Sequence, residues 1–112
     1  FRADERHLNP REVVHGGWMT SFVDVAMAQS ALYELGVVAL TPTIHLEADF
    51  LAPILPGAWV ECDVKLVKST HRMNFVEAMS YADGEPVVRS SAIYRKPRDM
   101  QKRVGTNLSP TD

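Results

Sequence analysis

The chain has 112 residues, of which 46% are hydrophobic and 23% charged, so one globular domain of ordinary composition is expected. Its net charge of −2 provides no general attraction to nucleic acid or to an anionic membrane, and no apolar stretch approaches the roughly 20 residues of a membrane-spanning helix. Cys62 is the only cysteine, which excludes an intrachain disulfide and favours a reducing, cytoplasmic location.

The first third of the chain predicts one long helix. Residues 1–14 are polar and mixed, with a turn at Asn9-Pro10, and they begin in what looks like the end of a strand whose earlier part is missing. Residues 16–35 predict a helix of about five turns, which a glycine pair opens and Gly36 closes. The apolar residues of this helix cover more than one stripe, so we expect it to be buried on several sides.

The remainder of the chain predicts four antiparallel strands, at 43–51, 58–68, 71–82 and 86–95. Asp83-Gly84 is a strong hairpin signal between the last two strands. One sheet face must cover the helix while the polar face meets water, which gives an α+β fold. The residues of the first strand expected to face the helix are Ile44, Leu46, Ala48 and Phe50. An exposed sheet edge could pair with a second copy of the chain.

Asp24 is a carboxylate in the middle of the otherwise apolar helix. Such a group is costly unless it is paired or hydrogen-bonded, so the chain either satisfies it locally, from the backbone or from Thr20, or uses it. Upstream, Gly16 and Gly17 leave backbone N–H groups uncovered at the helix start, where the macrodipole attracts negative charge. The combination favours acyl-transfer chemistry, although two glycines also permit close packing of the helix on the sheet.

The spacing of these residues resembles a known family. The pattern consists of Asn9-Pro10, His15-Gly16-Gly17, Asp24 and the strand Thr43–Leu51 leading to Pro53. Over residues 7–95 it is similar to the hotdog-fold acyl-CoA thioesterases, in the PaaI-like and 4-hydroxybenzoyl-CoA thioesterase branch. The resemblance implies a hotdog domain over residues 1–97, in which a curved antiparallel sheet wraps one central helix, followed by a flexible polar tail at 98–112. It also implies edge-to-edge homodimers or dimers of dimers, with each active site at a dimer interface.

The resemblance implies hydrolysis of an acyl-CoA thioester to the free acid and coenzyme A, with no metal and no cofactor beyond the coenzyme A of the substrate. Asp24 would be the general base or nucleophile, and the Gly16 N–H would bind the thioester oxygen of a site shared with the partner subunit. The other catalytic residues would be Asn9, Thr43 and His15, and the substrate-binding residues would be Gly17, Trp18 and Arg95.

Structural alternatives remain open for several of these residues. Asn9 could simply shape the turn before Pro10, and Thr43 could be an ordinary strand residue. The basic residues from Arg95 onward could form a solvated tail rather than contact the phosphates of coenzyme A. His15 is expected to organise the turn more than to transfer protons.

Two other functions also remain open. A hotdog hydratase acting on acyl-CoA or acyl-carrier protein would pair a catalytic histidine with an acid, and both His15 and Asp24 are present. A non-catalytic hotdog module would bind acyl-CoA without releasing thiol. A metal site is not expected because the histidines do not cluster at ligand spacing, and no serine lies in a nucleophile-elbow motif.

Overall fold

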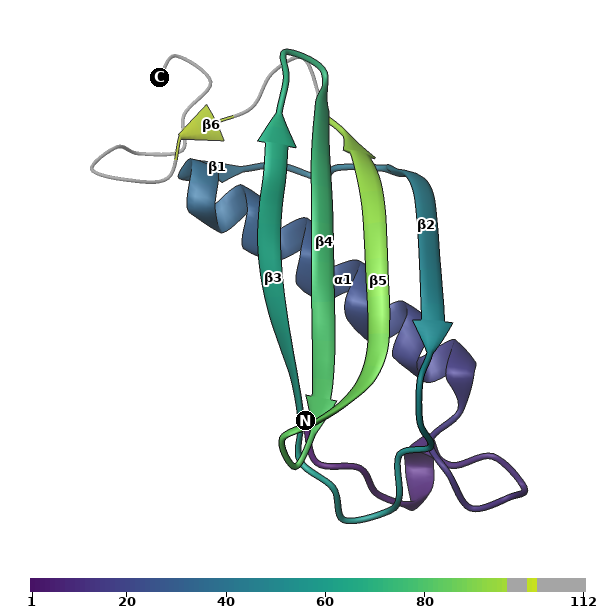
Figure 1. Cartoon of the computed structure of the whole chain (residues 1–112). Coiled ribbons are helices and arrows are strands. Elements are labelled where there is room, and N and C mark those ends of the chain that lie inside the picture. The colour runs from purple at the N-terminus through teal and green to yellow at the C-terminus, as the bar shows by residue number, and fades with distance from the viewer. Residues whose placement is uncertain (97–100, 103–112) are drawn as a thin grey trace.

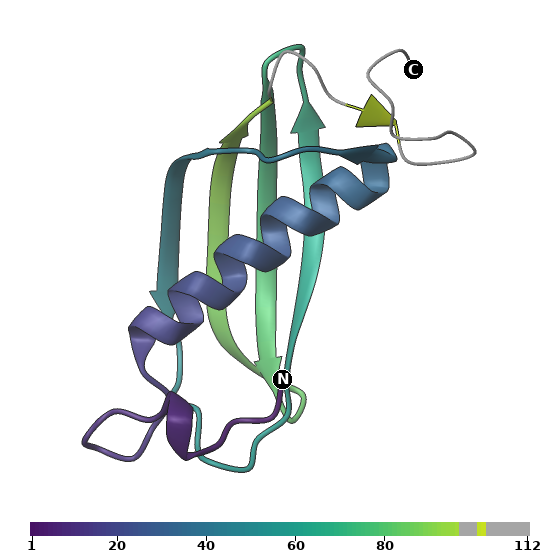
Figure 2. The same ribbon diagram turned by 180° about the vertical axis from the view of Figure 1, so that it is seen from behind.

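The computed structural model of the protein describes residues 1–96 and 101–102. One helix lies diagonally across one face of a four-stranded sheet (Figures 1 and 2). The strands follow the order β2-β5-β4-β3, and every neighbouring pair is antiparallel. This confirms the predicted α+β architecture of one long helix on an antiparallel sheet. The elements are α1 (Gly16–Leu35), β2 (Thr43–Phe50), β3 (Val60–Ser69), β4 (Met73–Ala82) and β5 (Glu85–Arg95).

Helix α1 begins and ends where the sequence predicted. At its start the His15 side chain is the N-cap, and its Nδ1 accepts a hydrogen bond from the Gly17 N–H at 2.8 Å. At its end Gly36 adopts a left-handed conformation with φ 71°, which a residue with a side chain would enter only at a cost. These local signals fix both ends of the helix relative to the sheet.

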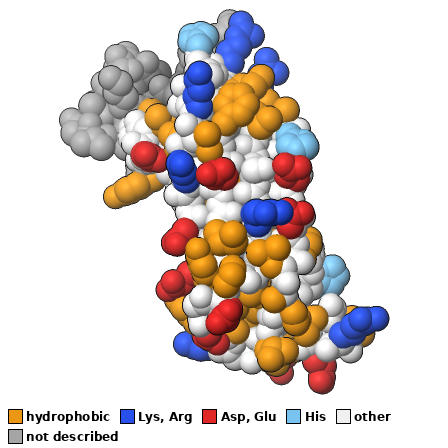
Figure 3. All heavy atoms as spheres, in the orientation of Figure 1, with side chains coloured by type: hydrophobic (Ala, Val, Ile, Leu, Met, Phe, Trp, Pro, Cys, Tyr) orange, Lys and Arg blue, Asp and Glu red, His pale blue; other side chains and the backbone are white. Residues whose placement is uncertain are grey.

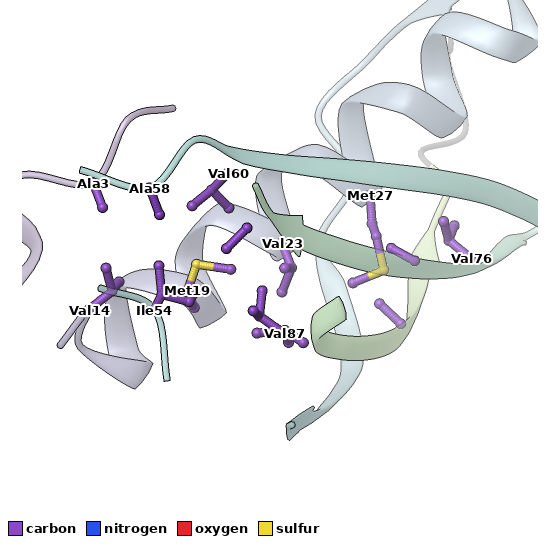
Figure 4. Packing of buried hydrophobic residues seen from close by; sticks show 14 of the residues in the cluster. Ala3, Val14, Met19, Val23, Met27, Ile54, Ala58, Val60, Val76 and Val87 are labelled. Carbon is purple, nitrogen blue, oxygen red and sulfur yellow. The ribbon is translucent and has the colours of Figure 1, made fainter. Parts of the chain in front are cut away.

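Buried apolar side chains fill the space between α1 and the sheet (Figure 4). Met19, Val23 and Met27 follow one another at four-residue intervals, so they lie on one face of the helix, and all three are buried. They belong to the same cluster as Val60 and Val76 of the sheet. Each fully buried side chain of this size contributes about 1.5–3 kcal/mol, so this single layer is the main source of stability.

The expectation that α1 would be buried on several sides is wrong for a single chain. Val25 is 62% exposed and Trp18 is 43% exposed, although both are large apolar residues. The physical reason is that the four-stranded sheet covers only one side of α1 among the described residues. Val25 is two residues from the buried Val23 and Met27, so it lies on the side of the helix away from the sheet.

Strand β2 is the edge of the sheet, which changes the burial of its predicted core face. Leu46 and Ala48 are half-buried, as expected. Ile44 and Phe50 remain 49% and 55% exposed, because no further strand lies beyond β2 in the described part of the chain. The alternation of the sequence predicted the face of Leu46 and Ala48 correctly. It could predict neither the edge position of the strand nor the register shift between Thr43 and His45, which brings Thr43 to the helix side.

The outer face of the sheet is polar only in part, because Val67, Phe75 and Ile93 line a pocket on it beside the polar residues. Arg89 donates to Asp49 at 2.9 Å and the Ser91 hydroxyl donates to Glu47 at 3.1 Å, in both cases between the paired strands β5 and β2. Figure 3 shows acidic and basic side chains side by side on this face. Asp83-Gly84 forms the hairpin between β4 and β5 as predicted, with both residues at positive φ.

Three short elements were not foreseen. They are a 3-10 turn, η1 (Glu5–His7), and the two-residue strands β1 (Val37–Val38) and β6 (Gln101–Lys102), which pair with each other. Apart from β6, the predicted tail at 98–112 lies outside the described residues. The N-terminus follows the edge of β3, where the Ala3 N–H donates to the Ala58 carbonyl at 2.9 Å. None of the helices in the described residues is long and apolar enough to cross a membrane.

Candidate active site

The Asp24 carboxylate is held by two hydroxyl groups from the sheet. Tyr94 of β5 donates to Oδ1 at 2.8 Å, and the same hydroxyl lies 2.8 Å from the Asp24 main-chain carbonyl oxygen. Thr43 of β2 donates at 3.0 Å to Oδ1 and lies 3.3 Å from Oδ2. The suggested partner Thr20 is wrong, because its hydroxyl donates instead to the Gly16 carbonyl at 2.9 Å. Asp24 is therefore satisfied by tertiary contacts, with one of its predicted partners, Thr43, among them.

Tyr94 is the site residue that sequence reasoning missed. It is only 1% exposed, and burial raises the pKa of its hydroxyl well above the usual value, with the hydrogen bond to Asp24 acting in the same direction. The hydroxyl therefore remains protonated and serves as a donor. No local signal could have found it, because Tyr94 lies 70 residues from Asp24 along the chain.

The start of α1 presents two uncommitted backbone donors among the described residues, the N–H groups of Gly16 and Trp18. The Gly17 N–H is occupied by His15 Nδ1, whereas nothing in the described residues accepts a hydrogen bond from the Gly16 N–H. Because the first N–H groups of a helix carry partial positive charge, Gly16 offers a site for an oxyanion. His15 organises the turn, as expected, and its Nδ1 must be unprotonated to accept the bond.

An apolar groove of about 360 Å³ lies beside the Gly16 N–H. Every residue that lines it is apolar or glycine, including Gly16, Met19, Phe50, Ile54 and Val88. The Phe50 ring approaches the place where a Gly16 Cβ would lie to 3.5 Å, which is ordinary contact. Close packing therefore does not require glycine here, but the small residue leaves the groove open to the N–H.

Two predicted site residues are engaged in other contacts. Asn9 Oδ1 accepts hydrogen bonds from the Arg11 and Val13 N–H groups, at 2.9 and 3.4 Å, so it holds the turn before the helix. The Trp18 ring packs against His7, with ring centroids 4.5 Å apart. Among the described residues, no group of His, Cys, Asp or Glu side chains could hold a metal ion.

Basic side chains gather at the end of the sheet nearest Asp24. Arg95 directly follows Tyr94 and pairs across β4 with Met73, the neighbour of Arg72. Both arginines are exposed, whereas Lys96 is anchored, with Nζ donating to Ser69 Oγ at 2.9 Å. Figure 3 shows basic side chains at this end of the molecule. The side chains of the later basic residues Arg98, Lys102 and Arg103 lie outside the described part.

The oxyanion donor and the carboxylate are far apart within one chain. Asp24 follows Gly16 by eight residues in α1, which separates them by about 12 Å along the helix axis. Gly16 lies beside Phe50 at one end of β2, and Asp24 contacts Thr43 at the other end. One carbonyl group could not contact both in a single chain.

Comparisons with known proteins agree with this architecture. A protein of Pseudomonas aeruginosa named "Putative esterase PA0474" is 26% identical over 97 residues, which cover 87% of this chain and 72% of that protein. The phenylacetic acid degradation protein PaaI of Thermus thermophilus, solved as a mutant, has a similar fold, with TM-score 0.75, 19% identity and coverage of 84% of this chain and 78% of that chain. The protein BH2602 of Bacillus halodurans, solved with CoA, gives TM-score 0.76, 23% identity and coverage of 85% and 67%.

These solved structures share the hotdog fold that the sequence predicted. The family model of the thioesterase superfamily matches residues 12–89, which include α1, the whole of β2 to β4 and the predicted glycine and carboxylate positions. That match covers well over half of the chain. The chain therefore belongs to the thioesterase superfamily, which confirms the predicted enzyme class, a thioester hydrolase.

Proposed function

We propose that this chain hydrolyses acyl-CoA thioesters, with Asp24 as the general base. The observation that carries the proposal is the environment of the carboxylate, which is half-buried and held by two neutral hydroxyls. No cation among the described residues forms an ion pair with it. A carboxylate that is positioned but not neutralised can accept a proton from water.

The reaction then balances without a cofactor. Asp24 takes a proton from a water molecule, whose oxygen attacks the thioester carbonyl carbon. The Gly16 N–H stabilises the resulting oxyanion at the positive end of α1. When the C–S bond breaks, the proton held by Asp24 passes to the leaving thiolate of coenzyme A. The products are the free acid and the free thiol.

The distance between Gly16 and Asp24 favours a site made by two chains. If two copies pair antiparallel along their β2 edges about a two-fold axis, the Phe50 end of one strand lies beside the Thr43 end of the other. Gly16 of one chain then faces Asp24 of the partner subunit. The same pairing would cover the exposed apolar side chains Ile44 and Phe50 of β2, which a single chain leaves in water.

The groove and the basic end suggest where the two parts of the substrate bind. The side chains that line the groove beside Gly16 are all apolar, so it fits an uncharged alkyl or aryl acyl group. Arg72 and Arg95 lie at the Asp24 end, where guanidinium groups would contact phosphates of coenzyme A. The Bacillus halodurans relative was solved with CoA, which supports an acyl-CoA ligand for this chain.

The hydratase alternative is weaker because His15 has a structural task. The separation of about 13 Å along the helix between His15 and Asp24 of one chain does not discriminate, since a two-chain site would bring His15, like Gly16, close to Asp24 of the partner subunit. The His15 Nδ1 is occupied as the helix cap. The non-catalytic alternative is distinguished by measuring free thiol, because a module that only binds acyl-CoA would release none.

Asp24→Asn tests the proposed chemistry. The amide oxygen can still accept the hydrogen bonds from Tyr94 and Thr43, so the fold should be retained while the base is lost. We expect release of free thiol from acyl-CoA to fall by roughly 10²–10⁴-fold. Asp63→Asn makes the same chemical change on the outer sheet face and should leave the rate unchanged. A wild-type rate for Asp24→Asn would show that Asp24 is not the base.

The nucleophilic alternative for Asp24 has its own test. Single-turnover hydrolysis in ¹⁸O-labelled water places the label directly in the acid product when Asp24 acts as a base. Label found first in the Asp24 carboxylate would instead show a covalent acyl-enzyme anhydride.

A further inference from the structure

We propose that Tyr94 is a positioning residue that gives the two oxygens of Asp24 different tasks, with Oδ1 anchored and Oδ2 left to react. The inference rests on the proposed role of Asp24 as the base. Tyr94 does not face the substrate, because its side chain is buried beneath α1. Its effect on the reaction would pass entirely through the carboxylate.

The contacts of the two carboxylate oxygens are unequal. Oδ1 receives the Tyr94 hydroxyl at 2.8 Å and the Thr43 hydroxyl at 3.0 Å. Oδ2 has only the longer 3.3 Å contact with Thr43. Since each hydroxyl has a single proton, and Thr43 lies closer to Oδ1, both protons are directed to Oδ1. The lone pairs of Oδ2 therefore remain available for the proton of a water molecule.

Tyr94 can satisfy its hydroxyl in both charge states of Asp24. While the carboxylate is ionised, the hydroxyl proton points to Oδ1, which is the stronger acceptor. When Oδ2 has taken a proton from water, Oδ1 becomes a weaker acceptor. The Tyr94 proton can then turn to the Asp24 main-chain carbonyl, which is also 2.8 Å away. A buried donor is thus never left without an acceptor during turnover, so the side chain need not move.

The surroundings of Tyr94 make it a rigid anchor. Its residue in β5 is paired with Thr43 of β2 on one side and with Asn74 of β4 on the other. Tyr94 and Thr43 are paired residues of two neighbouring strands. The same two strands, β5 and β2, therefore fix both hydrogen-bond donors to Oδ1. A donor set on rigid strands reduces the motion of the base.

Tyr94→Phe tests the proposal because it removes the hydroxyl and keeps the ring. We expect kcat to fall by roughly tenfold or more with KM unchanged, as for loss of a hydrogen bond to a charged group. The acid limb of the pH–rate profile should move to higher pH, because the ionised Asp24 carboxylate loses a hydrogen-bond donor that stabilises its charged form. Besides Asp24, Cys62 of β3 is the titratable group whose charge affects the Tyr94 hydroxyl. The variant Cys62→Ser, measured in parallel, shows how much Cys62 contributes to the pH profile.

Tyr81→Phe is the matched control. It deletes the same hydroxyl on β4, toward the opposite end of the strand from Asn74, the residue paired with Tyr94. Its kinetics and pH profile should match those of the wild type. Circular dichroism and the thermal midpoint of Tyr94→Phe should show a folded protein, which separates loss of positioning from loss of structure.

A measurement independent of activity distinguishes failure of this inference from failure of the proposed function. The Asp24 carboxyl can be titrated by ¹³C NMR in the wild type and in Tyr94→Phe, and we expect the midpoint to rise in the variant. An unchanged midpoint with an unchanged kcat would overturn the role of Tyr94 while thiol release by the wild type upholds the proposed function. Absence of thiol release by the wild type would overturn the proposed function and, with it, any catalytic role for Tyr94, while the titration would still report the contact.

Discussion

Replacing Gly16 with alanine should separate stability from activity. The new Cβ would lie 3.5 Å from the Phe50 ring, which is ordinary contact rather than a clash. Alanine is favoured over glycine in a helix by about 1 kcal/mol, so the thermal midpoint should stay constant or rise by about 4 °C. Because the Cα–Cβ bond of a helical residue points toward the helix N-terminus, the methyl group would crowd the Gly16 N–H. Loss of one oxyanion donor lowers kcat by about 10²–10³-fold.

Gly17→Ala provides the contrasting variant. Its Cβ would lie 3.0 Å from His15 Nδ1, so the imidazole must shift by a few tenths of an ångström and the helix cap is weakened. An N-cap contributes about 0.5–2 kcal/mol, which offsets or exceeds the gain from alanine. We therefore expect Gly17→Ala to melt at a lower temperature than Gly16→Ala. Thermal unfolding and thiol release measured on the same samples give both quantities.

Mixing two inactive variants tests whether the site spans two chains. In a heterodimer of Gly16→Ala and Asp24→Asn, one site contains both substitutions and the other contains neither. After unfolding and refolding together in equal amounts, about half of the dimers are mixed, so roughly a quarter of the wild-type activity should return. No recovery on mixing would refute the two-chain site. Full activity of Gly16→Ala alone would refute its role as the oxyanion donor.

Two further predictions concern the basic end and the N-terminal turn. Arg72→Ala should raise KM for acyl-CoA several-fold without changing kcat. Hydrolysis of an N-acetylcysteamine thioester, which lacks the nucleotide, should be unaffected. An equal effect on both substrates would exclude a phosphate contact. Hydrogen bonding from Arg6 lowers the pKa of Asp4 from 3.8 to about 2, so its ionised form stabilises the fold above pH 4 and this contribution disappears as the pH falls toward 2. Asp4→Asn should therefore lower the thermal midpoint at pH 7 but not at pH 2, and an equal difference at both values would contradict this reasoning.

Local signals account for the parts of the fold that were predicted well. Gly36 ends the helix because of its own backbone conformation, and Asp83-Gly84 form the hairpin for the same reason, so neither needs information from the rest of the chain. Each end of the four strands lies within about two residues of its predicted position. The alternation of apolar and polar residues that predicted them is also a local signal. The family match then confirmed the hotdog fold and the enzyme class that the residue spacing had indicated.

The details of the candidate site depend on long-range contacts, which the sequence does not display. Thr20 was a reasonable partner for Asp24 at helical spacing, but its hydroxyl bonds to its own helix backbone. The shorter of the two hydrogen bonds to Oδ1 comes from Tyr94, 70 residues further along the chain. The exposure of Ile44 likewise follows from the strand order, which places β2 at the edge. The catalytic and binding roles assigned to Asn9, Trp18 and Arg95 remain predictions.

The polar pairs on the outer face of the sheet determine what kind of partner can cover them. Arg89 with Asp49, and Ser91 with Glu47, satisfy one another within the plane of the sheet and keep their remaining polar atoms in water. A second sheet stacked flat on this face would have to strip that water, and ion pairs removed from solvent are at best weakly favourable. A partner that covers these polar pairs must therefore be polar and retain bridging water there, whereas Val67, Phe75 and Ile93 on the same face offer it apolar contact.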